Sequence, residues 1–363
     1  MNNSRPIHIL SLFFILLLSL GMMNHVMVIP MLLGAAARDA WLVPMIFLPI
    51  LALWLALLHF ILKRISPFSF NDWLDKHFGR AISWIIRIVL SLVTLFMGIT
   101  TLFDTVNWTH STYLQTTPTV VLAAICLIVS GTVAVLGIGP LAITSGVLLP
   151  MVSVLGYFVS FTNHKYKDYK YLFPILEHGW TPVWQGMVHV AGGLLELWII
   201  LIIRHRVKGQ IRYWQLLLLG FLLIGLIIGP TIGAITEFGP FEAALQRDPA
   251  YEQWRLVKIG RFIEHVDFLS IFQWLSGAYV RIALATYLSL ELWNLQKMKH
   301  RLLATLAIGS FLLIILAVGA TRAAVEIFLQ QMQFPFVLSV SLSFTLLLGL
   351  MMLIFRHRKD RSL

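Results

Sequence analysis

The chain has 363 residues, of which 59% are hydrophobic and only 12% are charged. Soluble domains are usually about 45–50% apolar and about 25% charged. With 27 Lys and Arg and 16 Asp and Glu, the chain has too few charges to cover a water-soluble fold of this size, which places most of it in lipid. The net charge of +11 does not indicate a nucleic-acid partner, because the basic residues alternate with long apolar runs.

The sequence carries no recognisable chemical signature. The single cysteine, Cys126, lies inside an apolar run, so an intramolecular disulfide or a cysteine-based metal cluster cannot form. The sequence has no phosphate-binding glycine loop, no nucleophile elbow and no zinc-protease motif. We therefore expect no enzyme activity, no cofactor and no metal site.

Ten apolar stretches are long enough, at about 20 residues each, to cross the hydrocarbon core of a bilayer. The predicted spans are 7–33, 41–62, 81–103, 118–137, 140–161, 186–203, 211–235, 267–293, 302–320 and 334–355. The first is not a cleaved signal peptide, because its apolar run exceeds the roughly 7–15 residues of a signal core.

Basic residues are distributed unevenly between the two sides of these spans. If the N-terminus is inside, 16 Lys and Arg fall in cytoplasmic segments and nine on the opposite side, with Arg87 and Arg281 inside spans. Because cytoplasmic loops carry an excess of Lys and Arg, this bias predicts that both termini are cytoplasmic.

Two spans are interrupted near their middle. Residues 21–25, Gly-Met-Met-Asn-His, interrupt the first span, and Gly192, Gly193 and Glu196 interrupt the sixth. These spans begin the two halves, about 7–161 and 186–355, of a single membrane domain covering residues 1–363. Interrupted helices in matching positions predict an all-α, LeuT-like, five-plus-five inverted repeat with helices 1 and 6 broken.

Broken helices have a chemical consequence. Half-helix N-termini expose N–H groups that suit a carboxylate, and exposed carbonyl groups suit an ammonium, so such a pair would bind a zwitterion. The alternative is that these glycines allow close packing between helices, as small residues often do in membranes.

Glu196 is the most costly residue in its setting. A carboxylate at the centre of a membrane helix costs about 2.5–3.5 kcal/mol on insertion scales unless it faces a cavity or a partner. Three roles are open: Glu196 holds a ligand amine, takes up a proton, or pairs with Arg281, which lies near the middle of the eighth span.

Three separated segments carry a family resemblance. Residues 37–42 read Ala-Arg-Asp-Ala-Trp-Leu, and residues 192–196 read Gly-Gly-Leu-Leu-Glu. Residues 261–268 read Arg-Phe-Ile-Glu-His-Val-Asp-Phe and are followed by Gln273-Trp274 and by Tyr-Val-Arg at 279–281. From about residue 7 to 355 the chain resembles the B subunits of spore germinant receptors, the endospore germination permeases of the amino acid–polyamine–organocation superfamily.

The resemblance implies a nutrient-sensing subunit in the inner membrane of a bacterial spore, partnered by an A subunit and a lipoprotein C subunit. It also implies a small germinant, typically an amino acid, between the first and sixth spans with contributions from the third and eighth. Carried onto this chain, the implied ligand-binding positions are Gly21, Asn24, Thr100, Thr101, Gly192, Gly193, Glu196 and Phe272. Met22 and Met23 depart from the compact small-Gly-small run that transporters of this fold often show in the first span. Their bulkier side chains would narrow or reshape the pocket, which leaves sugars, nucleosides or a co-germinant open as ligands.

Three functional classes fit this architecture: a sensor, a proton- or ion-coupled amino acid permease, and a channel. The fifth span, residues 140–161, offers no Lys to replace a sodium ion, which disfavours ion-coupled transport. With the family resemblance, the sequence favours the sensor.

Overall fold

The computed structural model of the chain describes residues 6–66, 68–260, 263–318 and 332–360. The regular structure of these residues is helical, and extended pairing among them is limited to two isolated bridges, Ile7 with Val207 and Ile259 with Ile263. The α-helices are α1 (Ile9–Met22), α2 (Val28–Ala36), α3 (Leu42–Ile65), α4 (Phe70–Thr112), α5 (Thr119–Leu136), α6 (Ile138–Thr162), α7 (Thr181–Leu194), α8 (Ile200–Ile203), α9 (Tyr213–Phe238), α10 (Pro240–Leu245), α11 (Pro249–Arg255), α12 (Leu269–Leu292), α13 (Met298–Val318) and α15 (Phe334–Asp360).

Eight helical segments in the described part of the chain are long and apolar enough to cross a membrane. An all-helical integral membrane protein is therefore confirmed, whereas the predicted count of ten is not reached by this criterion. Helices α1 to α3 count together as the 57-residue segment Ile9–Ile65, and α12 is not among the eight. Polar side chains, Arg281 and Glu291 among them, lower the mean hydropathy of α12. Residues 319–320 of the predicted ninth span lie outside the described residues.

Most helix ends fall within a few residues of the predicted spans, and α4 is the main difference. It begins at Phe70, well before the predicted residue 81, and continues to Thr112. The hydroxyl of Ser69 caps the start of α4 by accepting a hydrogen bond from the Asp72 N–H at 3.1 Å. Gly79 then kinks the helix with φ 75° and ψ 165°, a conformation that a residue with a Cβ rarely adopts.

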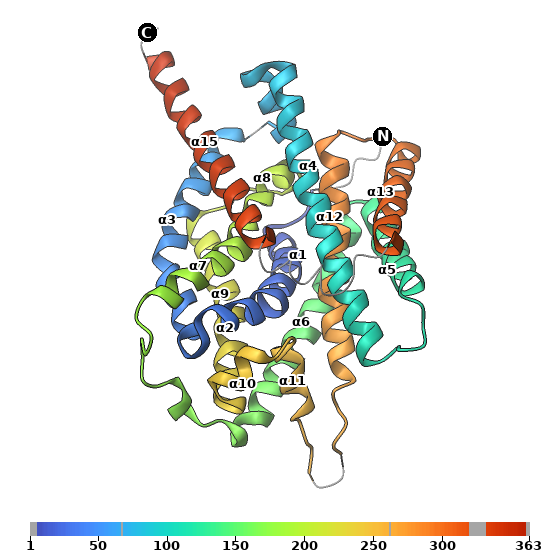
Figure 1. Cartoon of the computed structure of the whole chain (residues 1–363). Coiled ribbons are helices and arrows are strands. Elements are labelled where there is room, and N and C mark those ends of the chain that lie inside the picture. Colours follow the sequence, from blue (N-terminus) through green and yellow to red (C-terminus); the bar gives the residue numbers. More distant parts are fainter. Residues whose placement is uncertain (1–5, 67, 261–262, 319–331, 361–363) are drawn as a thin grey trace.

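The centre of the bundle is formed by α1 and by the stretch that follows α7. Figure 1 shows α1 between α3 and α12, and α1 packs directly on α12, α6 and α9. The span Thr181–Arg206 is 89% buried over its most apolar window, far more than the other seven candidates. A helix that is apolar on all sides belongs inside a bundle, and this one is enclosed by α2, α3 and α15.

Both predicted helix breaks take a different form from the one expected. The first span continues from α1 through a π-helix, η1 (Met23–Met27), into α2, and the residues at its junctions, Met22 and Val28, keep right-handed helical dihedrals. The sixth span passes from α7 through a 3-10 helix, η5 (Leu195–Ile199), into α8. The expectation of unwound segments with bare peptide groups is therefore wrong. The helical hydrogen-bond pattern instead changes locally at these polar residues.

A buried carboxylate fixes one end of the bundle. Glu291, at the end of α12, lies 3.3 Å from Arg206 and 3.6 Å from Arg301. Arg301 also donates hydrogen bonds to the carbonyl oxygens of Ala134 and Val135, at 2.7 and 2.9 Å, where α5 ends. The first described residues and the end of α15 lie at this same end of the molecule, and α10 and α11 lie at the opposite end (Figure 1).

Candidate functional site

A buried ion pair lies at the middle of the bundle. The two guanidinium nitrogens of Arg281, on α12, contact the two carboxylate oxygens of Glu196, on η5, at 2.8 and 2.9 Å. The Arg281 side chain is 0% exposed and that of Glu196 is 4% exposed. Of the three roles considered for Glu196, pairing with Arg281 is the one present in the structure. The forked contact consists of one charge-assisted hydrogen bond, from Nη2 to Oε1, and one ion-pair contact, between Nη1 and Oε2.

Arg281 also binds two further helices. Its Nε donates to the Thr101 hydroxyl on α4 at 2.9 Å, and its Nη1 donates to the carbonyl oxygen of Ser19 on α1 at 3.3 Å. One side chain therefore ties α12 to α1, α4 and η5. Because each N–H that is drawn out of water needs an acceptor, these contacts stabilise the buried charge.

The glycines of the sixth span allow close packing. A Cβ on Gly192 would lie 2.9 Å from the Phe334 carbonyl oxygen, and a Cβ on Gly193 would lie 2.8 Å from Val28 Cγ2 and closer still to Asn24 Oδ1. The Asn24 amide donates to the Leu20 carbonyl at 2.8 Å and reaches the Gly193 carbonyl at 3.5 Å. These predicted ligand residues thus contact one another across α7 and η1.

The other predicted positions are more dispersed. Thr100 lies 3.5 Å from the Gln333 amide near the start of α15 and also bonds back to its own helix. Phe272 is partly buried on α12, and its carbonyl accepts from the Ser276 hydroxyl at 2.6 Å. The structure thus brings Thr101, Glu196 and Arg281 together and leaves Thr100 and Phe272 outside this cluster.

A cavity of about 560 Å³ lies beside α1. It is formed by α1 with η1, α6, α9, α11 and α12, and it falls in the size range of small-molecule sites. Most of its wall is apolar. The polar and hydroxyl-bearing side chains that line it are His25, Ser153, Tyr157, Ser160, Tyr251, Gln253, Ser270 and Gln273.

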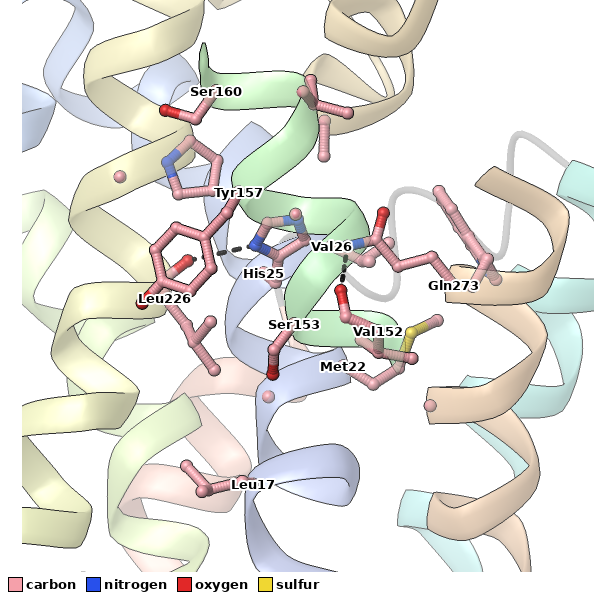
Figure 2. Close-up of a pocket in the computed structure, with 18 of the residues that line it drawn as sticks. Leu17, Met22, His25, Val26, Val152, Ser153, Tyr157, Ser160, Leu226 and Gln273 are labelled. Atoms are coloured by element: carbon pink, nitrogen blue, oxygen red, sulfur yellow. Dashed lines mark hydrogen bonds between the residues drawn. The ribbon is translucent and has the colours of Figure 1, made fainter. Parts of the chain in front are cut away.

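Two hydrogen bonds connect helices across this cavity (Figure 2). His25 Nδ1 donates to the Leu226 carbonyl oxygen at 3.3 Å, which joins η1 to α9. Gln273 Nε2 donates to the Val152 carbonyl oxygen at 3.4 Å, which joins α12 to α6, and its Oε1 accepts from Trp254 at 2.8 Å. Hydrogen bonds from two uncharged side chains thus connect the helices that form the cavity wall.

Of the eight ligand-binding residues predicted, Gly21 alone appears among the described residues that line this cavity. The sequence reasoning missed His25 and Gln273 as site residues. Both carried a signal, because His25 belongs to the polar interruption of the first span and Gln273 to the Gln-Trp pair of the family resemblance. No sequence feature marked Ser153, Gly225 and Gly229 as cavity residues, because nothing in the sequence distinguishes a cavity-facing residue from a lipid-facing one.

Stacked aromatic rings close the end of the cavity near α11. Trp274 and Trp108 are parallel, with ring centroids 4.2 Å apart, and Tyr251 packs edge-on against Trp108 at 5.5 Å. Burial raises the pKa of the Tyr251 hydroxyl, so it remains a neutral donor, and it lies 3.4 Å from an Asp267 carboxylate oxygen. These features suit reversible binding of a small molecule. In the described part of the chain, no three His, Cys, Asp or Glu side chains gather as metal ligands would.

Membrane-length helices around a buried ion pair and a cavity define the class as an integral membrane protein. Comparison with known proteins identifies the family. The spore permease family, described as spore germination protein, matches residues 6–324. The chain belongs to this family, as the resemblance implied. The family is a class of membrane proteins of spore germination and not a class of enzymes.

Two relatives cover most of the chain. Spore germination protein XB of Bacillus anthracis is 39% identical over 287 residues, which are 79% of this chain and 81% of that protein. The spore germination protein YfkT of Bacillus subtilis (strain 168) is 26% identical over 263 residues, 71% of each chain.

The close contact at Gly193 predicts that Gly193→Ala lowers the free energy of unfolding by about 1–3 kcal/mol, because the added methyl group overpacks the contact with η1. Thermal unfolding of the purified protein in detergent measures this loss. Gly309→Ala is the matched control, since a Cβ there meets nothing within 4 Å. Equal stability of the two variants would contradict the packing role of Gly193.

The fork between Arg281 and Glu196 predicts that Lys cannot replace Arg281. Arg281→Lys should lower the free energy of unfolding by about 1.5–3 kcal/mol, because a single ammonium cannot serve Glu196, Thr101 and Ser19 together. Arg255→Lys is the control, since Arg255 is 60% exposed and pairs with Glu252 at 2.9 Å on the surface of α11. We expect the control to lose less than about 1 kcal/mol, and a loss as large as that of Arg281→Lys would refute the distinction.

Proposed function

We propose that the chain is the germinant-sensing membrane subunit of a spore germination receptor and that it binds a small molecule in the cavity beside η1. Membership of the germination family supports the biological role. A cavity of about 560 Å³ with mixed apolar and polar walls supports the binding role.

The observation that carries this proposal is that α1 both contacts the ion pair and lines the cavity. The carbonyl group of Ser19 binds Arg281, whereas Gly21, Met22, His25 and Val26, within the next two turns, line the cavity. A ligand that favours one arrangement of η1 would shift the contacts of Arg281 with α1. A sensor needs this kind of link, because a ligand changes a conformational equilibrium only by its difference in affinity for the two states.

The finer architecture is part of the proposal. We take α1 with η1 and α2 as one crossing, α3 as the next, and α12 as a further crossing, which gives ten in two halves, about 7–161 and 186–355. At 57 residues, Ile9–Ile65 is more than twice the length needed for one crossing, which supports its division. Modified helices in corresponding positions, η1 and η5, support an inverted repeat.

Family membership supports a proposal for location and partners. We place the chain in the inner membrane of the spore, with both termini on the core side, in a complex with A and C subunits. The excess of Lys and Arg on one side supports this orientation, since such residues concentrate on the cytoplasmic side.

Blocking the cavity tests the sensing role. A Cβ at Gly225, which lines the cavity, meets nothing within 4 Å, so Gly225→Phe has room to enter the cavity without displacing its walls. We expect spores carrying Gly225→Phe to lose at least about tenfold in nutrient sensitivity while the chain accumulates normally on immunoblots. Gly309→Phe, at an open position outside the cavity, should respond like wild type.

Normal nutrient dose dependence of Gly225→Phe spores would refute binding in this cavity. Uptake by reconstituted vesicles separates the sensor from an ion-coupled amino acid permease. A sensor leaves labelled amino acid outside the vesicles, whereas a permease concentrates it when a proton or sodium gradient is applied.

A further inference from the structure

The wall of the cavity is electrically neutral. Among the described residues that line it, none is Asp, Glu, Lys or Arg. The nearby buried charges are already paired: Arg281 with Glu196, and Lys167 with Glu237 at 3.7 Å. The carboxylate of Asp267 accepts from Tyr113 at 3.1 Å and also meets Tyr251. A charged ligand would therefore find no formal counter-charge on the side chains that line the cavity, and the Asp267 carboxylate behind Tyr251 is already bonded to two tyrosine hydroxyls.

The backbone does not supply the missing charges either. η1 remains helical, with the Val28 N–H bonded to the Met23 carbonyl, and the Leu226 carbonyl on α9 is taken by His25. η1 is therefore not an unwound segment whose free peptide groups would bind a carboxylate and an ammonium. Burying either ionic group without partners costs several kcal/mol, so a free zwitterion is disfavoured.

One polar group of the wall lacks a partner. Trp274 is 5% exposed, and its indole N–H has no hydrogen-bond partner among the described residues. Trp254, which also lines the cavity, has its N–H bonded to Gln273 at 2.8 Å. Buried donors are normally paired, so an unpaired donor in a cavity wall indicates a ligand acceptor.

The cavity opens sideways between two helices. Tyr157 on α6 and Phe221 on α9 both line it, yet they are 68% and 60% exposed. Large apolar rings that remain exposed at mid-helix in a membrane protein face the bilayer. This opening suits a ligand that can pass through an apolar environment.

We infer that this cavity takes an uncharged organic molecule, held against the rings of Trp254 and Trp274 and accepting a hydrogen bond from the Trp274 indole N–H, and that it excludes free amino acids. This inference rests on the proposed function, whose ligand it assigns to a chemical class. It departs from the amino acid implied by the family resemblance.

Thiol labelling measures which molecules enter. Cys126 is the single cysteine of the chain, so Ser153→Cys on a Cys126→Ser background places one thiol in the cavity wall. The probes are N-ethylmaleimide, which is neutral, and a cationic and an anionic methanethiosulfonate, applied to the full-length protein in vesicles. Each labelling rate is divided by the rate of the same reagent at Gln115→Cys, an exposed position between α4 and α5.

We expect the normalised rate of N-ethylmaleimide to exceed that of both charged reagents by at least about tenfold, because an unpaired charge enters an apolar cavity unfavourably. Adding Gly225→Phe should abolish this labelling, which shows that the reagent reacts inside the cavity. Millimolar L-alanine or L-leucine should leave the rate unchanged.

Three results would overturn the inference: equal rates for neutral and charged reagents, protection by either amino acid, or no labelling by N-ethylmaleimide, which would mean a closed or lipid-filled cavity. These results leave the proposed function to its own assay. If Gly225→Phe spores lose nutrient sensitivity while charged reagents label the cavity of the protein in vesicles, the sensing role stands and the uncharged ligand is rejected.

Discussion

A charge held inside an apolar bundle constrains the rest of this molecule. The Arg281 guanidinium is fully enclosed, and Glu196, Thr101 and the Ser19 carbonyl compensate for the burial of its charge. Each partner comes from a different helix, so the positions of α1, α4 and η5 relative to α12 are set by one side chain. Losing one partner would leave a buried charge uncompensated, which is far more costly than losing a surface ion pair.

This constraint explains why the central helices change form without unwinding. An unwound first span would move the Ser19 carbonyl and remove an acceptor from Arg281. The π-helix at Met23–Met27 instead turns Asn24 toward Gly193 and places His25 beside Leu226, with the chain still helical. Within two turns, α1 and η1 therefore contact Arg281 through the Ser19 carbonyl and line the cavity through Gly21, Met22 and His25.

The membrane spans were predictable because the length of an apolar run is a direct physical requirement. The start of α4 was not, because the polar residues after Ser69 have low hydropathy and become helical through capping and packing. Glu196 and Arg281 could be singled out by the cost of a charge in lipid. The roles of Gly192 and Gly193 could not be decided, because a glycine that permits close packing and one that breaks a helix are identical in sequence. The cavity depends on which faces of α6 and α9 meet, and no local pattern records this.

The most direct test of the central claim is a double-mutant cycle on Glu196→Gln and Arg281→Met, with the free energy of unfolding measured in detergent. The ion pair predicts that each single variant loses about 3–5 kcal/mol and that the double variant loses much less than their sum, because it buries no unpaired charge. Losses that add to within about 0.5 kcal/mol would show that the two side chains act independently and would contradict the account.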